Sequence, residues 1–187
     1  MKEYKTKNLF YPEPVLILGS YDDSGNPDAM NAAWGGRYDT NEIFVCLASH
    51  ASTDNILSKK QFTVAFADVP HAASADYVGM VSLNQEPEKM KKSGLRIEKA
   101  PDVDAPLFPD LPITIECEVE RFDGNKEEGG ILIGRILKAL VREDVLDQKG
   151  NIDMAKARLI CLDESDHAYH EVGPKVADAF RAGLSLK

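Results

Sequence analysis

The amino-acid sequence predicts a mainly β fold with peripheral helices, arranged as an antiparallel barrel or sandwich. Residues 113–120 read Ile-Thr-Ile-Glu-Cys-Glu-Val-Glu, and this alternation of apolar and polar side chains is typical of a strand with one buried face. Other short apolar runs are joined by short polar segments, as antiparallel neighbours require. We expect the acidic face of residues 113–120 to meet water, and that face carries Glu116, Glu118 and Glu120.

The order of elements follows from apolar runs, turn formers and helix signals. Turn-forming residues at 22–26 separate runs at 15–18 and 28–34, which predicts a β-hairpin. The remaining expected strands are rich in β-forming residues: 43–48, 61–67, 113–120, 130–141 and 157–162. A polar loop is expected at 123–130. The expected helices are 53–60, capped by Thr53 or Asp54, then 71–82, 87–93 and, behind Pro174, 175–182.

The 187 residues are expected to form a single domain spanning 1–187. The sequence contains no internal repeat and no low-complexity tract. Residues 94–112 hold four prolines and could be mistaken for a linker. Because too few strands follow to build an independent domain, we interpret this segment as a long surface connection.

The charge balance narrows the choice of partners. The chain carries 22 Lys and Arg against 31 Asp and Glu, a formal charge of −9. An acidic surface repels nucleic-acid phosphates and anionic lipids, and no dense basic cluster offsets it. The apolar runs are also much shorter than the roughly 20 residues of a membrane helix. Nucleic acids and membranes are therefore not expected partners.

The cysteines and histidines indicate neither a metal site nor a disulfide framework. Cys46, Cys117 and Cys161 are far apart and each lies in an apolar stretch, so we expect buried reduced thiols in a cytoplasmic protein. The charged residues 1–7 are followed by prolines rather than an apolar run, which predicts no signal peptide. His167 and His170 are three apart in a strand-like segment, where they would point to opposite faces. No metal is therefore expected.

Residues 49–56, Ser-His-Ala-Ser-Thr-Asp-Asn-Ile, form the most suggestive polar stretch of the chain. They follow an expected strand and precede an expected helix. Free N–H groups and the positive dipole end at a helix N-terminus suit a phosphate even in an acidic protein. Simple helix capping is the alternative, because Ser, Thr and Asp are preferred N-caps.

Residues 31–36, Asn-Ala-Ala-Trp-Gly-Gly, combine an amide, small residues and the chain's single tryptophan. Small residues allow a flat ligand to approach the backbone, whose polar groups can then recognise the ligand's edge. A strand end with a core tryptophan is the alternative interpretation. The sequence has no GxSxG motif, which disfavours a serine-hydrolase site, and no GxGxxG or P-loop motif, which excludes Rossmann and kinase-type nucleotide sites.

Several short segments of the chain form a recognisable series through their order and spacing: 14–18, 23–25, 31–34, 44–48, 53–56, 61–64, 76–79, 87–90, 93–95, 116–117 and 131–136. This series resembles the flavin reductase-like family of FMN-binding split barrels. The resemblance extends over about residues 10–180 and does not rest on any one motif. The resemblance implies an antiparallel split β-barrel of Greek-key type and a homodimer with one FMN per subunit near the dimer interface.

The resemblance also implies which residues hold the FMN. Asn31, Ala32, Ala33 and Trp34, together with Ala48 and Ser49, would line the isoalloxazine, while His50, Ser52, Thr53 and Asn55 would hold the phosphate and ribityl chain. Backbone N–H groups near Ala48 and Ser49 would stabilise negative charge on the reduced ring. The segment 77–82 departs from the family pattern, which leaves the nicotinamide or partner side of the pocket open.

Three functions are compatible with these residues. The first is an FMN oxidoreductase that takes a hydride from NADH or NADPH and passes electrons to an acceptor; the cofactor supplies the chemistry, which explains why no catalytic motif is present. The second is a non-catalytic FMN electron carrier reduced by a separate partner protein. The third is a barrel that binds no flavin and serves as an oligomeric interaction domain.

Overall fold

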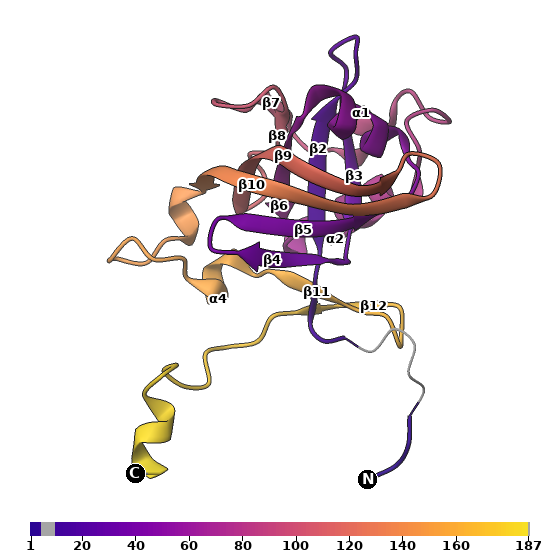
Figure 1. Cartoon of the computed structure of the whole chain (residues 1–187). Helices are drawn as coiled ribbons and strands as arrows, with labels where there is room; N and C mark the ends of the chain where they lie inside the picture. The colour runs from indigo at the N-terminus through magenta and orange to yellow at the C-terminus, as the bar shows by residue number, and fades with distance from the viewer. Residues whose placement is uncertain (5–9, 187) are drawn as a thin grey trace.

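The computed structural model describes residues 1–4 and 10–186 of the chain, and its body is a curled antiparallel sheet with helices on its outside (Figure 1). Part of the segment on which the signal-peptide prediction rests, residues 5–9, lies outside the described residues. The strands are β1 (Glu13–Pro14), β2 (Leu16–Tyr21), β3 (Pro27–Ala32), β4 (Gly35–Asp39), β5 (Glu42–Leu47), β6 (Gln61–Phe66), β7 (Glu98–Lys99), β8 (Pro106–Leu107), β9 (Ile113–Asn125), β10 (Gly129–Val141), β11 (Ile160–Asp163) and β12 (Ala168–Glu171).

Seven strands form the main sheet in the order β3-β2-β6-β9-β10-β5-β4, and every neighbouring pair is antiparallel. The two longest strands, β9 and β10, pair with register shifts near Gly134 and Lys138, and such irregularities increase the local twist. The sheet curls until β3 contacts β5. The predicted mainly β, antiparallel barrel architecture is confirmed.

Strand β2 is buried on both faces, which explains why its sequence is a continuous apolar run rather than an alternating one. Leu16 and Leu18 point into the barrel core, where they pack with Phe62 among others. Val15 and Ile17 face the opposite way, into a second core beneath the outer helices. The barrel therefore has a packed interior and a packed outer wall.

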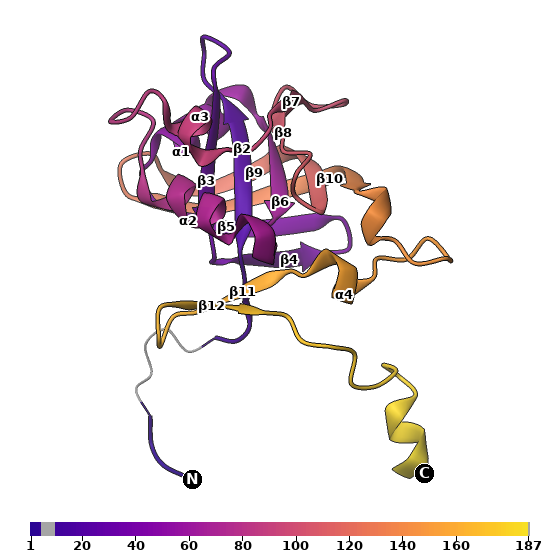
Figure 2. The same ribbon diagram turned by 180° about the vertical axis from the view of Figure 1, so that it is seen from behind.

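The helices cover the outer wall and connect the strands (Figures 1 and 2). Helix α1 contacts β2 and β6, α2 contacts β3, and α3 contacts both α2 and β3. The helices are α1 (Ala51–Lys59), α2 (Ala72–Met80), α3 (Lys89–Ser93) and α4 (Met154–Ala157), with 3-10 turns η1 (Val69–His71), η2 (Glu143–Val145) and η3 (Ala182–Leu186). The start of α1 and the end of α2 therefore lie beside β3.

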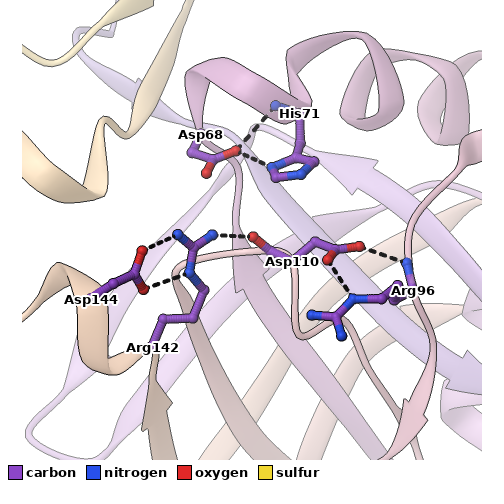
Figure 3. A network of polar contacts seen from close by, with 6 residues as sticks. All are labelled: Asp68, His71, Arg96, Asp110, Arg142 and Asp144. Carbon is purple, nitrogen blue, oxygen red and sulfur yellow. Dashed lines mark hydrogen bonds and ion pairs between the residues drawn. The ribbon is translucent and has the colours of Figure 1, made fainter.

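The proline-rich segment 94–112 is tied to the body by a polar network (Figure 3). Arg96 Nε donates to Asp110 Oδ1 over 2.7 Å, and Arg142 Nη1 donates to the Asp110 carbonyl oxygen over 2.6 Å. Nearby, Asp68 accepts from the backbone N–H of His71 and lies 2.6 Å from its ring Nδ1, at the turn before α2. The segment is a long connection, but the predicted surface position is wrong for much of it, because Leu95, Phe108 and Leu111 are buried in the core beneath the outer helices.

Several sequence predictions are wrong. Glu116 does not face water: it is fully buried and accepts a hydrogen bond from the Asp102 N–H. Strand β4 was not expected, because its Gly-Gly-Arg-Tyr-Asp sequence lacks an apolar run; it forms by pairing with β5. The predicted loop 123–130 shrinks to residues 126–128, because the pairing of β9 with β10 continues to Asn125 and Gly129.

The carboxy-terminal prediction is also wrong. Residues 175–182 form bends and turns, and only the 3-10 turn η3 follows. This segment extends away from the body, as both views show (Figures 1 and 2). The three cysteines are free; Cys117 is buried as expected, whereas Cys46 and Cys161 are partly exposed. No helix of the described residues is long and apolar enough to cross a membrane.

Candidate functional site

A cavity of about 150 Å³ lies on the outer wall of the barrel, between β3, the start of α1 and the segment from α2 to α3. Its polar lining includes Asn31 from β3, His50 and Ser52 from the start of α1, and Lys89 from α3. The end of α2 and the residues after it supply an apolar and backbone wall. The cavity therefore joins two of the stretches singled out in the sequence.

A buried ion pair forms the floor of this cavity. Lys89 Nζ lies 3.0 Å from Asp28 Oδ1, and the two side chains are 3% and 1% exposed. Ser52 Oγ donates to the second carboxylate oxygen of Asp28 over 2.5 Å. Because a buried charge is costly unless it is paired, this arrangement holds an ammonium group in place at the cavity. Asp28, Ser52 and Lys89 all line the cavity.

The N-terminus of α1 meets the same cavity, but its geometry differs from the simple capping that the sequence allows. The N-cap residue is His50, not Thr53 or Asp54, and its side chain makes no capping hydrogen bond. The Thr53 hydroxyl instead donates to the Ala48 carbonyl oxygen over 2.8 Å. The first backbone N–H groups of a helix have no hydrogen-bond partner within the helix. At the start of α1 these groups are therefore available to a ligand.

The polar residues of 49–56 are divided between two hollows. His50 and Ser52 line the cavity described above. Ser49 and Asn55 line a separate, more open hollow that also includes Lys126. Asn55 Nδ2 is buried and has no hydrogen-bond partner in the structure. A single small ligand in the first cavity would therefore not contact every residue of the stretch.

Residues 31–34 are also divided. Asn31 lines the cavity, whereas Ala32 points into the barrel core. Trp34 is 56% exposed and donates from Nε1 to Glu164 Oε1 over 2.6 Å, so the alternative of a core tryptophan is wrong. Ala33 is partly exposed and Ala48 is exposed. These residues lie beside an open surface rather than inside a closed pocket.

Comparison with known proteins identifies the family. The flavin reductase like domain matches residues 8–160. The chain belongs to the flavin reductase-like family. Flavoredoxin of Desulfovibrio vulgaris (Miyazaki F) has the same fold with a TM-score of 0.90 and 28% identity, over 98% of this chain and 100% of that one. A search of curated proteins gave no match.

Two further solved structures are similar to this flavin reductase-like protein. Flavoredoxin from Methanosarcina acetivorans has a TM-score of 0.88 at 23% identity, over 100% of this chain and 99% of that one. Nitrilotriacetate monooxygenase component B from Bacillus cereus has a TM-score of 0.77 at 19% identity, over 95% and 98%. These matches confirm the predicted split-barrel fold, which another neighbour names in its description.

The cavity of this flavin reductase-like chain is also lined by residues that were not singled out in the sequence. Asp28 and Lys89 are 61 positions apart, and neither has a role predicted from the sequence, although Lys89 lies in the segment 87–90 that carries the family resemblance. Val78, Gly79 and Ser82, from the segment that departs from the family pattern, line the cavity as well. In the sequence Lys89 is followed by a methionine and two further lysines, Lys91 and Lys92, which is typical of an exposed charged segment and does not suggest a buried charge.

Among residues 1–4 and 10–186, no group of three or more His, Cys, Asp or Glu side chains is arranged to hold a metal ion. His167 lies in a turn with a positive φ of 52° outside β12, so its spacing from His170 has no strand periodicity.

Proposed function

We propose that this protein binds FMN and acts as an NADH- or NADPH-dependent flavin reductase-like oxidoreductase. The observation that carries the proposal is the cavity at which a buried Lys89 ammonium, His50 and the N-terminus of α1 lie together. A buried cation and free helix N–H groups suit a phosphate monoester in a chain whose net charge is −9. Because Asp28 balances the charge of Lys89, the cavity would offer an anionic cofactor a locally neutral site with free N–H groups in an otherwise acidic protein.

The residues present fit FMN at two ends. The phosphate would be held by Lys89 and by the backbone N–H groups at the start of α1, with His50 beside them. The isoalloxazine would extend along Asn31, Ala33 and Trp34 towards Ala48 and Ser49. When bound, FMN would supply the redox chemistry by accepting a hydride from NADH or NADPH and passing the two electrons to an acceptor. The protein would bind and orient the ring.

A second copy of the chain would complete the site. A drug-sized ligand needs a pocket of roughly 300–1,000 Å³, which exceeds the single-chain cavity. The ring-lining residues Trp34 and Ala48 are exposed, as are Phe180 and Leu184 on the carboxy-terminal segment that leads away from the body (Figure 2). Exposed apolar side chains of this size favour burial against a partner. We therefore propose a homodimer with FMN near its interface.

The second candidate is a non-catalytic FMN electron carrier reduced by a separate protein. It is favoured by the 28% identity to a flavoredoxin over nearly the full length of both chains. The wide, open hollow between the β2–β3 turn and α3, lined by Pro27, Leu83 and Met90, offers room for a nucleotide or a redox partner beside the cavity. The two candidates share the cofactor and differ in the electron donor. Free cysteines accord with the reducing cytoplasm for both.

The deciding experiment is anaerobic reduction of the purified, FMN-loaded protein. A yellow flavin spectrum that bleaches within minutes on addition of NADH or NADPH supports the reductase. A flavin spectrum that persists with both nucleotides, yet bleaches with dithionite, supports the carrier. A protein that retains no FMN after reconstitution contradicts both and leaves the flavin-free interaction domain.

A further inference from the structure

A chain of hydrogen bonds reaches the cavity from three elements that are distant in the sequence. Tyr169 Oη, on β12, lies 2.9 Å from Asp76 Oδ1, on α2. Asn31 Nδ2, on β3, lies 3.3 Å from the same Tyr169 Oη and 3.1 Å from the Ala75 carbonyl oxygen. Asn31 is the member of this chain that lines the cavity.

The direction of each hydrogen bond follows from the chemistry of the partners. The Ala75 carbonyl can only accept, so the Asn31 atom that faces it must be the amide nitrogen and not the oxygen. The nitrogen's second hydrogen then goes to Tyr169 Oη, which accepts it and donates its own proton to the Asp76 carboxylate. Both hydrogens of the Asn31 amide are therefore used within the protein.

This assignment leaves Asn31 Oδ1 as the free polar atom of the side chain. Within residues 1–4 and 10–186, Oδ1 accepts no hydrogen bond that would compete with a ligand. Close packing also limits movement of the side chain, since a Cβ at Gly79 would lie 2.7 Å from Asn31 Cβ. Burial and the bond to Asp76 raise the pKa of Tyr169 to about 12, so its proton stays in place at neutral pH.

We propose that Asn31 Oδ1 recognises the N3–H group of oxidised FMN, and that Tyr169 and Asp76 are positioning residues that fix the orientation of this acceptor. N3–H is the single N–H group of the oxidised isoalloxazine, so an acceptor beside the ring selects it. The inference rests on the proposed binding of FMN. It assigns a function to β12, which lies outside the barrel sheet.

The experiment compares binding of FMN with binding of 3-methyl-FMN, which lacks the N3–H. Flavin fluorescence quenching gives both dissociation constants for the wild type, Tyr169→Phe and Asp76→Ala. We expect the wild type to prefer FMN by about tenfold or more, because a buried acceptor is left unpaired by the methylated ligand. In Tyr169→Phe and Asp76→Ala this preference should fall at least threefold, while binding of 3-methyl-FMN changes little.

Tyr77→Phe serves as the matched control, because Tyr77 adjoins Asp76 on α2 and belongs to no hydrogen bond of the chain described above. It should keep the wild-type preference. A wild type that binds FMN and 3-methyl-FMN equally overturns the proposal. A Tyr169→Phe variant that binds both flavins more weakly by the same factor also overturns it, because a purely structural role of Tyr169 gives that result. A wild type that binds neither flavin contradicts the proposed function itself.

Discussion

Lys89 Nζ and Asp28 Oδ1 form an ion pair over 3.0 Å at a depth where both side chains are almost fully buried. Asp28 lies on β3 in the main sheet, and Lys89 is the first residue of α3. The pair therefore links an outer helix to the barrel. The same pair lines the candidate cavity. Stability and ligand binding are therefore expected to depend on the same two side chains.

We predict that Lys89→Met lowers the free energy of unfolding by about 3–5 kcal/mol, because it leaves the Asp28 carboxylate buried without a counter-charge. Urea unfolding followed by circular dichroism measures the change. The double variant Asp28→Asn with Lys89→Met should recover at least half of the loss, since no buried charge remains.

Lys91→Met is the matched control for this prediction. Lys91 lies two residues further along α3, and its ion pair with Glu88 is largely exposed. Exposed pairs contribute little to stability, so the urea midpoint should hardly move. Equal losses for Lys89→Met and Lys91→Met would show that burial of the pair is unimportant.

His50 allows a test of the phosphate end without disturbing the fold. Its side chain is exposed, lines the cavity and makes no capping hydrogen bond. We predict that His50→Ala weakens FMN binding about three- to tenfold while riboflavin, which lacks the phosphate, binds as it does to the wild type. Fluorescence titration with both flavins measures this. A parallel loss for riboflavin would assign His50 to the ring or ribityl chain instead.

Much of the barrel was predictable because its strands carry strong local signals. Alternation along β9, the apolar run of β2 and the turn formers between β2 and β3 each indicate their own structure. Strand β4 carries no such local signal. Only its pairing with β5 makes it a strand. The burial of Glu116 was missed because periodicity cannot show that a loop covers the second face of a strand.

The candidate site was predictable only where its polar residues are local in sequence. The stretch 49–56 and Asn31 could be singled out because several polar or small residues occur together. Lys89 could not, because a lysine is normally exposed and its partner Asp28 is 61 positions away. Tyr169 of β12 reaches the site through its contact with Asn31, which is 138 positions away in the sequence. No local sequence pattern reveals such a contact.

Cys117 makes stability depend on pH in the alkaline range. Burial in β9, with a further contribution from Glu116, raises the pKa of this thiol from 9.0 to about 12. Below pH 9 the thiol is protonated in both states. Between pH 9 and 12 the unfolded state releases this proton while the folded state retains it, so the unfolded state binds fewer protons and stability falls as pH rises.

We predict that the wild type loses about 2 kcal/mol more than Cys117→Ala between pH 9 and pH 10.5, at about 1.4 kcal/mol per pH unit for one proton. Urea unfolding at both pH values measures the difference. The variant starts less stable because it has a cavity, but other titrating groups are common to both proteins and cancel. If the free energies of unfolding of the wild type and Cys117→Ala changed in parallel with pH, the Cys117 thiol would have the same pKa in the folded and unfolded states.

The carboxy-terminal segment provides the test of the proposed homodimer. Val176, Phe180, Leu184 and Leu186 are exposed in the single chain, and the segment leads away from the body (Figure 1). Exposed apolar side chains on an extended segment are not stabilised by their own body, and the proposed homodimer would bury them against a second copy. We predict that the double variant Phe180→Ser with Leu184→Ser forms monomers at micromolar concentration, where the wild type forms dimers.

Light scattering coupled to size-exclusion chromatography measures this difference in mass. Lys175→Ser is the control, because Lys175 lies in the same segment and its ion pair with Asp178 is local and exposed. It should remain dimeric. The Phe180 and Leu184 variant should also lose FMN, since the exposed Trp34 side of the site would lack its cover. A variant that remains dimeric would exclude this segment from the interface, and a monomeric wild type would contradict the homodimer.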